Sequence, residues 1–265
     1  MLNLLVAVEH NLASSFALRT VCLIDLQVRI QPFYVIDPPG RDISLGAGWA
    51  WNSWEREMRQ RARSEIEDLV LAERSQCTNI EEPIVATGDP VHVLTRHFWE
   101  NRFDLLVVGT PFREWGPRTL SRRFWQAARK SGRDLPLLLV RHLKSIRRVV
   151  VFTDGSEPAR KALDLFARLY PLLSCDVSLV GLVLEGRPPA GMQRVDLENA
   201  AAGLEARGIA AAVRGTLSLG GDELRAELKT ADLVVSPFLD AEHHSPFQEL
   251  LDHAVEAGIF YMAGA

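Results

Sequence analysis

The sequence has few cysteines and no long apolar segment. Its three cysteines, Cys22, Cys77 and Cys175, are far apart in 265 residues, and none belongs to a CxxC or Cys/His metal spacing. This usage is typical of a reducing compartment, so we expect a cytoplasmic protein. No apolar run approaches the roughly 20 residues that span a bilayer. The apolar start of the chain lacks the length and the basic residues of a signal peptide, so we expect no membrane association.

Motifs of known catalytic sites are also missing. The chain has no GxSxG, no GxxxxGK[ST] and no HExxH motif. The segment that most resembles a set of metal ligands contains Asp240, Glu242, His243 and His244. Adjacent histidine side chains point apart unless the backbone bends, which argues against a metal site there. We therefore expect a protein that is not an enzyme and that holds no metal.

The charge is unevenly distributed. The net charge of −4 argues against general nucleic-acid binding, but the segment 112–148 holds eleven basic residues and only two acidic ones. Guanidinium groups pair well with phosphate, so the first arginines of this segment are candidate ligands of a small anion. The alternative is a solvated basic helix face, or pairing with the acidic remainder of the chain. These arginines are Arg113, Arg118, Arg122 and Arg123.

Short apolar runs alternate with amphipathic stretches, and this order occurs twice. Residues 6–9 match residues 151–154 at an offset of 145, and residues 104–108 match 232–236 at an offset of 128. The second copy is therefore shorter, and the loop and helix after its second strand are the expected place of the shortening.

Strands that alternate with helices predict parallel sheets with helices on both faces. The sequence thus predicts an α/β protein of two tandem Rossmann-like, flavodoxin-like domains, residues 1–143 and 144–265, each with a five-stranded parallel sheet. The apolar last strands, 137–140 and 259–262, would be a liability as free edges. We expect them to pair, which makes the chain an intramolecular pseudo-dimer, with a further homodimer as an additional association.

Ligands of doubly wound sheets bind at the carboxyl ends of the strands. In the first copy these ends carry Glu9, Asp37, Gly109 and Thr110. In the second copy Asp154, Gly155 and Ser156 would hold a ribose or a base. The alternative is structural, since Asp and Ser cap helices and Gly makes turns.

Several of these segments are similar to the universal stress protein family. Residues 151–157 with Ala162-Leu163 resemble the opening of such a domain, 88–90 with 104–110 its middle, and 33–38 its second strand. The resemblance implies an adenine nucleotide alpha hydrolase-like fold, often dimeric or tandem, and a role in stress tolerance. Some members bind ATP or AMP through an acidic residue after strand one, which here would be Glu9 or Asp154.

In ATP-binding members a glycine loop after strand four cradles the phosphates. Its pattern is Gly, two residues, Gly, nine residues, Gly, then Ser or Thr. Counted from Gly109, the later positions hold Phe112, Arg122 and Arg123, and counted from Pro237 they hold Asp240, Leu250 and Leu251. We therefore predict a non-enzymatic stress-response or regulatory protein that binds a small anionic ligand or a protein partner. The alternatives are an ATP- or AMP-binding protein with at most slow hydrolysis, and a purely structural module.

Overall fold

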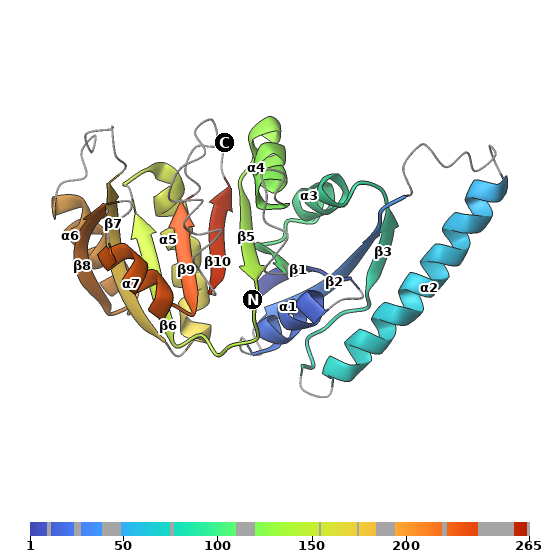
Figure 1. Ribbon diagram of the computed structural model, residues 1–265, viewed down its shortest axis with the longest axis horizontal. Helices are drawn as coiled ribbons and strands as arrows, with labels where there is room; N and C mark the ends of the chain where they lie inside the picture. Colours follow the sequence, from blue (N-terminus) through green and yellow to red (C-terminus); the bar gives the residue numbers. More distant parts are fainter. Residues whose placement is uncertain are drawn as a thin grey trace. The chain divides into compact units, whose positions relative to one another are not determined.

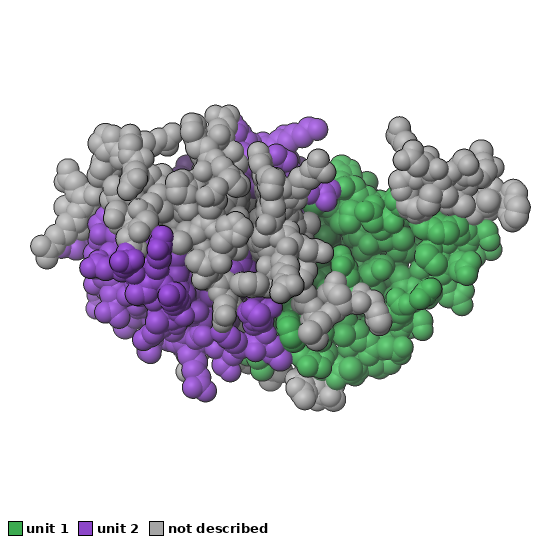
Figure 2. All heavy atoms as spheres, in the orientation of Figure 1, with its two compact units in different colours: residues 1–111 green, residues 112–265 purple. Residues whose placement is uncertain are grey.

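The chain forms two compact units, residues 1–111 and 112–265 (Figure 2). The structure is a computed structural model. It describes residues 1–9, 12–23, 28–38, 49–74, 77–109, 120–153, 155–173, 175–183, 194–218, 222–237 and 257–263.

The first unit is a four-stranded parallel sheet with three helices (Figure 1). Its strands are ordered β3-β2-β1-β4. Its elements are β1 (Leu2–Ala7), α1 (Leu12–Cys22), β2 (Val28–Ile36), α2 (Trp49–Arg74), β3 (Ile84–Thr87), α3 (Pro90–Glu100) and β4 (Leu105–Gly109).

Apolar strands and amphipathic helices account for this arrangement. Leu4, Leu5 and Val6 of β1 are fully buried, as expected for a parallel strand with helices on both faces. Helices α1 and α2 contact each other, and α2 runs along β2 and β3 (Figure 1). The chain reverses direction across the sheet between β3 and β4, so a right-handed crossover places α3 on the opposite face.

In the part of the second unit that the structure describes, six strands are ordered β5-β10-β9-β6-β7-β8. Strands β6 to β10 are paired in parallel, in the same relative order as in the first unit. Its elements are α4 (Leu120–Ser131), β5 (Leu135–Val140), β6 (Arg148–Thr153), α5 (Glu157–Leu169), the 3₁₀ turn Tyr170–Leu172, β7 (Asp176–Val183), α6 (Arg194–Glu205), β8 (Ala211–Ser218), α7 (Asp222–Thr230), β9 (Leu233–Pro237) and β10 (Gly258–Ala263).

The last strands of the two sequence copies pair with each other. Strands β5 and β10 are antiparallel, with Leu138 opposite Phe260, and both of these side chains are buried. An ion pair supports the same region, because Lys161 Nζ of α5 lies 2.9 Å from Asp134 Oδ2 before β5. The expected pairing of the two apolar strands is confirmed.

The α/β fold class predicted from the sequence is confirmed. Within the second unit, Gly215 lies inside β8 at a register shift opposite Val180. Its φ of +92° allows the extra residue of a β-bulge.

The predicted domain limits, 1–143 and 144–265, stay a prediction. The compact units divide elsewhere, at Pro111, because β5 pairs with β10 and so belongs to the second unit. Among the described residues, no helix has both the length and the hydropathy that a bilayer crossing requires.

We expect Gly88→Ala to destabilise the protein. Gly88 has a φ of +146°, and an added Cβ would lie 2.9 Å from Cγ2 of the buried Val93. Strain and overpacking should together lower the free energy of unfolding by about 1–3 kcal/mol in urea titrations followed by circular dichroism. The control is Gly203→Ala in α6, where a Cβ meets nothing within 4 Å. It should stabilise by about 0.5–1 kcal/mol, and equal effects of the two variants would contradict the assigned backbone geometry.

Candidate functional site

The carboxyl ends of the first unit's strands bring several predicted site residues to one edge. Glu9 follows β1, Asp37 follows β2, and Gly109 ends β4. These strands are parallel and lie side by side, so the three residues share this edge of the sheet. Glu9 and Asp37 are both exposed, and Thr110 lies outside the described residues.

The turn that carries Glu9 is held by hydrogen bonds. The Glu9 backbone N–H donates to Ser14 Oγ of α1 at 2.9 Å, and Ser14 is buried. The Val8 N–H donates to the Phe33 carbonyl of β2 at 2.9 Å. The start of α1 and the neighbouring strand therefore fix the backbone of this turn, on which Glu9 is an exposed residue.

A charged group at this edge was not found from the sequence. It consists of Tyr34 on β2 with Arg61 and Glu65 on α2. Burial raises the pKa of the Tyr34 phenol, the nearby Glu9 and Glu65 carboxylates raise it further, and Arg61 lowers it. Arg61 Nε donates to Glu65 Oε1 at 2.9 Å. The four-residue spacing of Arg61 and Glu65 on a helix was a usable signal for their pairing, but nothing local pointed to Tyr34.

Helix α2 is also tied to the end of β3. Arg59 Nε donates to Thr87 Oγ1 at 3.3 Å, and Arg59 pairs with Glu55 at 2.7 Å. The edge therefore combines carboxylates, a phenol and guanidinium groups. Carboxylates accept hydrogen bonds from hydroxyl or amino groups, and the phenol both donates and accepts. This set suits a polar ligand that carries hydroxyl groups.

In the second copy, two of the candidate ligand-binding residues have structural roles, one as a helix cap and one in a turn. Ser156 is the N-cap of α5, and its Oγ accepts from the Ala159 N–H at 3.3 Å. Gly155 has a φ of +74°, and its N–H donates to Thr153 Oγ1 at 3.2 Å. Asp154 lies outside the described residues.

The candidate arginines belong to the second unit. Arg113 and Arg118 lie outside the described residues, as does the side chain of Arg122 on α4. Arg123 is exposed on the same helix, whereas Phe124 and Trp125 are buried beside it. This separation of basic and apolar side chains is that of an amphipathic helix.

The part of the chain that the structure describes contains no cluster of three or more His, Cys, Asp or Glu residues that could hold a metal. The loop residues Asp240, Glu242, His243 and His244, considered in the sequence for a metal, lie outside it.

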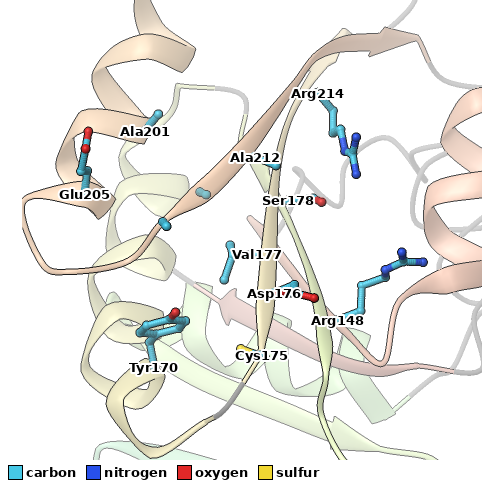
Figure 3. A pocket seen from close by; sticks show the side chains of 12 residues that line it. Arg148, Tyr170, Cys175, Asp176, Val177, Ser178, Ala201, Glu205, Ala212 and Arg214 are labelled. Atoms are coloured by element: carbon cyan, nitrogen blue, oxygen red, sulfur yellow. The ribbon is translucent and has the colours of Figure 1, made fainter.

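Two surface cavities lie away from the predicted site residues. One, of about 650 Å³, is in the second unit near the start of β6 and β7. Tyr170 and Glu205 lie on one side of β7, and Arg148 and Arg214 lie on the other (Figure 3). No predicted site residue lines this cavity.

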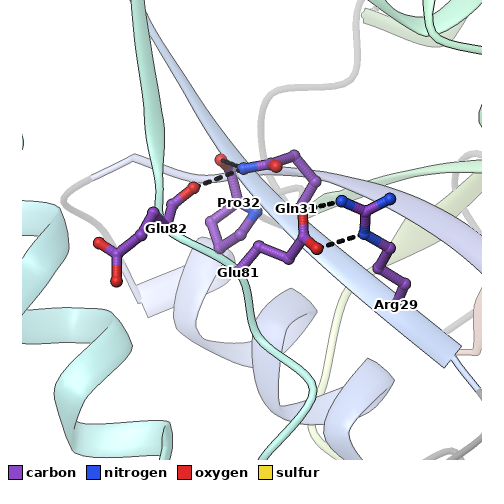
Figure 4. A network of polar contacts seen from close by, with 5 residues as sticks. All are labelled: Arg29, Gln31, Pro32, Glu81 and Glu82. Carbon is purple, nitrogen blue, oxygen red and sulfur yellow. Dashed lines mark hydrogen bonds and ion pairs between the residues drawn. The ribbon is translucent and has the colours of Figure 1, made fainter.

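The other cavity, of about 700 Å³, is in the first unit near the start of β2. The network beside it contains an ion pair between Arg29 and Glu81 (Figure 4). Gln31 Nε2 donates to the Glu82 carbonyl at 2.7 Å in the same network. These contacts hold the segment before β3 against β2, at the sheet edge opposite Glu9.

Comparison with known proteins identifies the fold. No protein-family model and no curated protein sequence matches the chain. The structure is similar to that of a universal stress protein from Archaeoglobus fulgidus, with 16% identity, 98% of this chain and 97% of that chain covered, and a TM-score of 0.70.

Two further structures are similar. A functionally unknown protein from Pseudomonas aeruginosa PAO1 has 13% identity, covers 98% and 91% of the two chains, and gives a TM-score of 0.57. A universal stress protein family member from Burkholderia pseudomallei has 21% identity, covers 53% and 96%, and gives a TM-score of 0.40. The full-length match to the Archaeoglobus protein shows that this chain has the fold of a two-domain universal stress protein.

Titration of Tyr34 tests the electrostatics of the edge. We expect its phenol to ionise above the usual pKa range of tyrosine, because burial and two carboxylates disfavour the phenolate. Glu9→Gln and Glu65→Gln should lower this pKa, and Arg61→Gln should raise it. Phenolate absorbance during a pH titration measures the shift, and Tyr34→Phe identifies the transition. If Glu9→Gln left the titration unchanged, the Glu9 carboxylate would not act on Tyr34.

Proposed function

We propose that this chain is a cytoplasmic regulatory protein of the universal stress protein type that is not an enzyme. It acts by binding a small polar ligand or a protein partner at the edge of the first unit's sheet where the carboxyl ends of its strands lie. The fold supports the type, and the residues at the edge support the binding role, since fold alone does not give function.

One observation carries this proposal. Glu9 and Asp37 end adjacent parallel strands, and both are exposed at the edge where doubly wound sheets bind ligands. Tyr34 lies close enough to Glu9 for the carboxylate to raise its pKa. Together they offer acceptors and a phenol to one ligand, which is the arrangement that a ribose or another polyol would use.

The residues of the familial phosphate loop fit ATP poorly. Backbone N–H groups hold a phosphate only where the chain can come close, which glycine permits. Phe112 and Arg122 in the first copy and Asp240 in the second replace these glycines. The Asp240 carboxylate would also repel phosphate. We therefore expect neither copy to bind ATP tightly.

The second candidate function is binding of an adenine nucleotide, with at most slow hydrolysis. Glu9 favours it, because it follows the first strand, where ATP-binding members carry their acidic contact. In this chain such a nucleotide would be held by its nucleoside and only weakly by its phosphates.

The proposal is tested by identifying small molecules released from the purified protein and by calorimetry with adenosine, AMP and ATP. We expect ATP to bind with a dissociation constant weaker than about 1 μM, or −8 kcal/mol. Glu9→Gln and Asp37→Asn should each weaken adenosine binding about tenfold, since hydrogen bonds to charged groups contribute roughly 1.5–3 kcal/mol.

The matched control is Glu81→Gln, which removes a carboxylate from the opposite edge. It should leave binding unchanged. Submicromolar ATP binding would contradict the proposal and favour the second candidate function. Equal loss in all three variants would contradict the location of the site.

Arg122 and Arg123 are predicted to increase the affinity for an anionic ligand. Binding of AMP or inorganic phosphate should weaken in Arg122→Ala and Arg123→Ala, and it should weaken with salt, which screens charge over about 10 Å at 0.1 M. Titrations at low and high salt measure both effects, with Lys130→Ala, an exposed cation of the same helix, as the control. Unchanged affinity in the arginine variants would show that these side chains only form a solvated basic face.

A further inference from the structure

Two cysteines that are 55 positions apart in the sequence meet at one end of the first unit. Cys22 is the last residue of α1, and Cys77 follows the end of α2. One helical turn earlier on each helix, Arg19 Nε contacts Glu73 Oε1 at 2.7 Å. The Cys77 N–H donates to the Glu73 carbonyl at 3.0 Å, which ties the cysteine to the last turn of α2. The ion pair holds the ends of α1 and α2 together, where the two cysteines lie.

The sulfur atoms interact directly. The Cys22 thiol donates a hydrogen bond to the Cys77 sulfur, and the Asn79 backbone N–H donates a second one. Cys77 is 5% exposed and Cys22 is half-buried. The hydrogen bond from Cys22 lowers the pKa of Cys77, and the same bond raises the pKa of Cys22. The Cys77 sulfur thus accepts two hydrogen bonds, which favour its thiolate form.

We propose that Cys22 and Cys77 form a reversible oxidation site that closes a disulfide when the protein meets a hydroperoxide. Neither the fold nor the ligand edge requires this pair, so the inference is independent of the proposed function. Disulfides in reducing compartments are typically transient and redox-sensing, which agrees with thiols that are free in this structure.

The reaction balances with hydrogen peroxide as the oxidant. The Cys77 thiolate attacks one peroxide oxygen, and the O–O bond breaks. Hydroxide departs, and Cys77 becomes a sulfenic acid. The Cys22 sulfur, as it loses its proton, attacks the Cys77 sulfur, and the sulfenic oxygen leaves as water. The two thiols lose two electrons and two protons in total, and the peroxide is reduced to two waters.

The bond would link α1 to the end of α2. The enclosed chain, 22–77, contains Tyr34 and Asp37 and the helix that carries Arg61. A cross-link across a loop of this length constrains the unfolded chain, so oxidation should raise the thermal unfolding midpoint by on the order of 10 °C. Dithiothreitol should reverse the shift.

The experiment treats the full-length protein with limiting hydrogen peroxide, blocks the remaining thiols with N-ethylmaleimide, and maps tryptic peptides without reduction. We expect a cross-link between peptides 20–29 and 75–96, which end at tryptic sites in the sequence. Cys175 is the internal control, because burial raises its pKa to about 11. It should react at least about tenfold more slowly.

Three variants complete the test. Cys175→Ser should form the cross-link and show the midpoint shift, whereas Cys22→Ser and Cys77→Ser should show neither. Binding of phenylarsine oxide to the reduced proteins gives a second readout that needs no oxidation, and it should require both Cys22 and Cys77. The proposal is overturned if peroxide links Cys175 between chains, or if both thiols of the pair remain free while Cys175 reacts.

Discussion

Burial of both faces of a parallel sheet is the constraint on which each compact unit depends. Leu4 and Leu5 of β1 point to opposite faces, and both are fully buried. Such strands need a helix on either side, and right-handed crossovers supply these helices. The same connectivity gathers the carboxyl ends of the strands at one edge. The position of Glu9 and Asp37 is thus a consequence of how the core is covered.

An apolar edge strand creates the second constraint. Leu138 of β5 and Phe260 of β10 are buried because the two strands pair with each other. Burying a side chain of this size contributes about 1.5–3 kcal/mol relative to leaving it exposed. This pairing places β5 in the second compact unit although it ends the first sequence copy. Compactness and sequence repetition therefore divide the chain at different residues.

The sequence predicted the fold class and the order of strands and helices along the chain, because apolar runs and repeat offsets can be read directly from the sequence. It did not predict the β-bulge, since Gly215 reads equally well as a turn or as an extra strand residue. The sequence also did not predict that Tyr34, Arg61 and Glu65 lie together, or that Cys22 contacts Cys77. These depend on how α2 lies against β2 and α1, and packing between distant segments has no signature in a single sequence.

The two sequence copies differ most where the candidate site lies. Ala7 and Phe152 are equivalent in the two copies, and their strand partners are Phe33 and Val180. The next residue after each partner is Tyr34 in the first copy and Gly181 in the second, so Gly181 is the counterpart of Tyr34. The second copy therefore has no phenol there. Its helix α6 has 12 residues where α2 has 26, and it packs on β7 and β8. Arg59 and Arg61, which reach the sheet edge, lie in the first half of α2. The offset between the copies falls from 145 to 128 across this same region, so the shortening of the second copy coincides with its shorter helix α6.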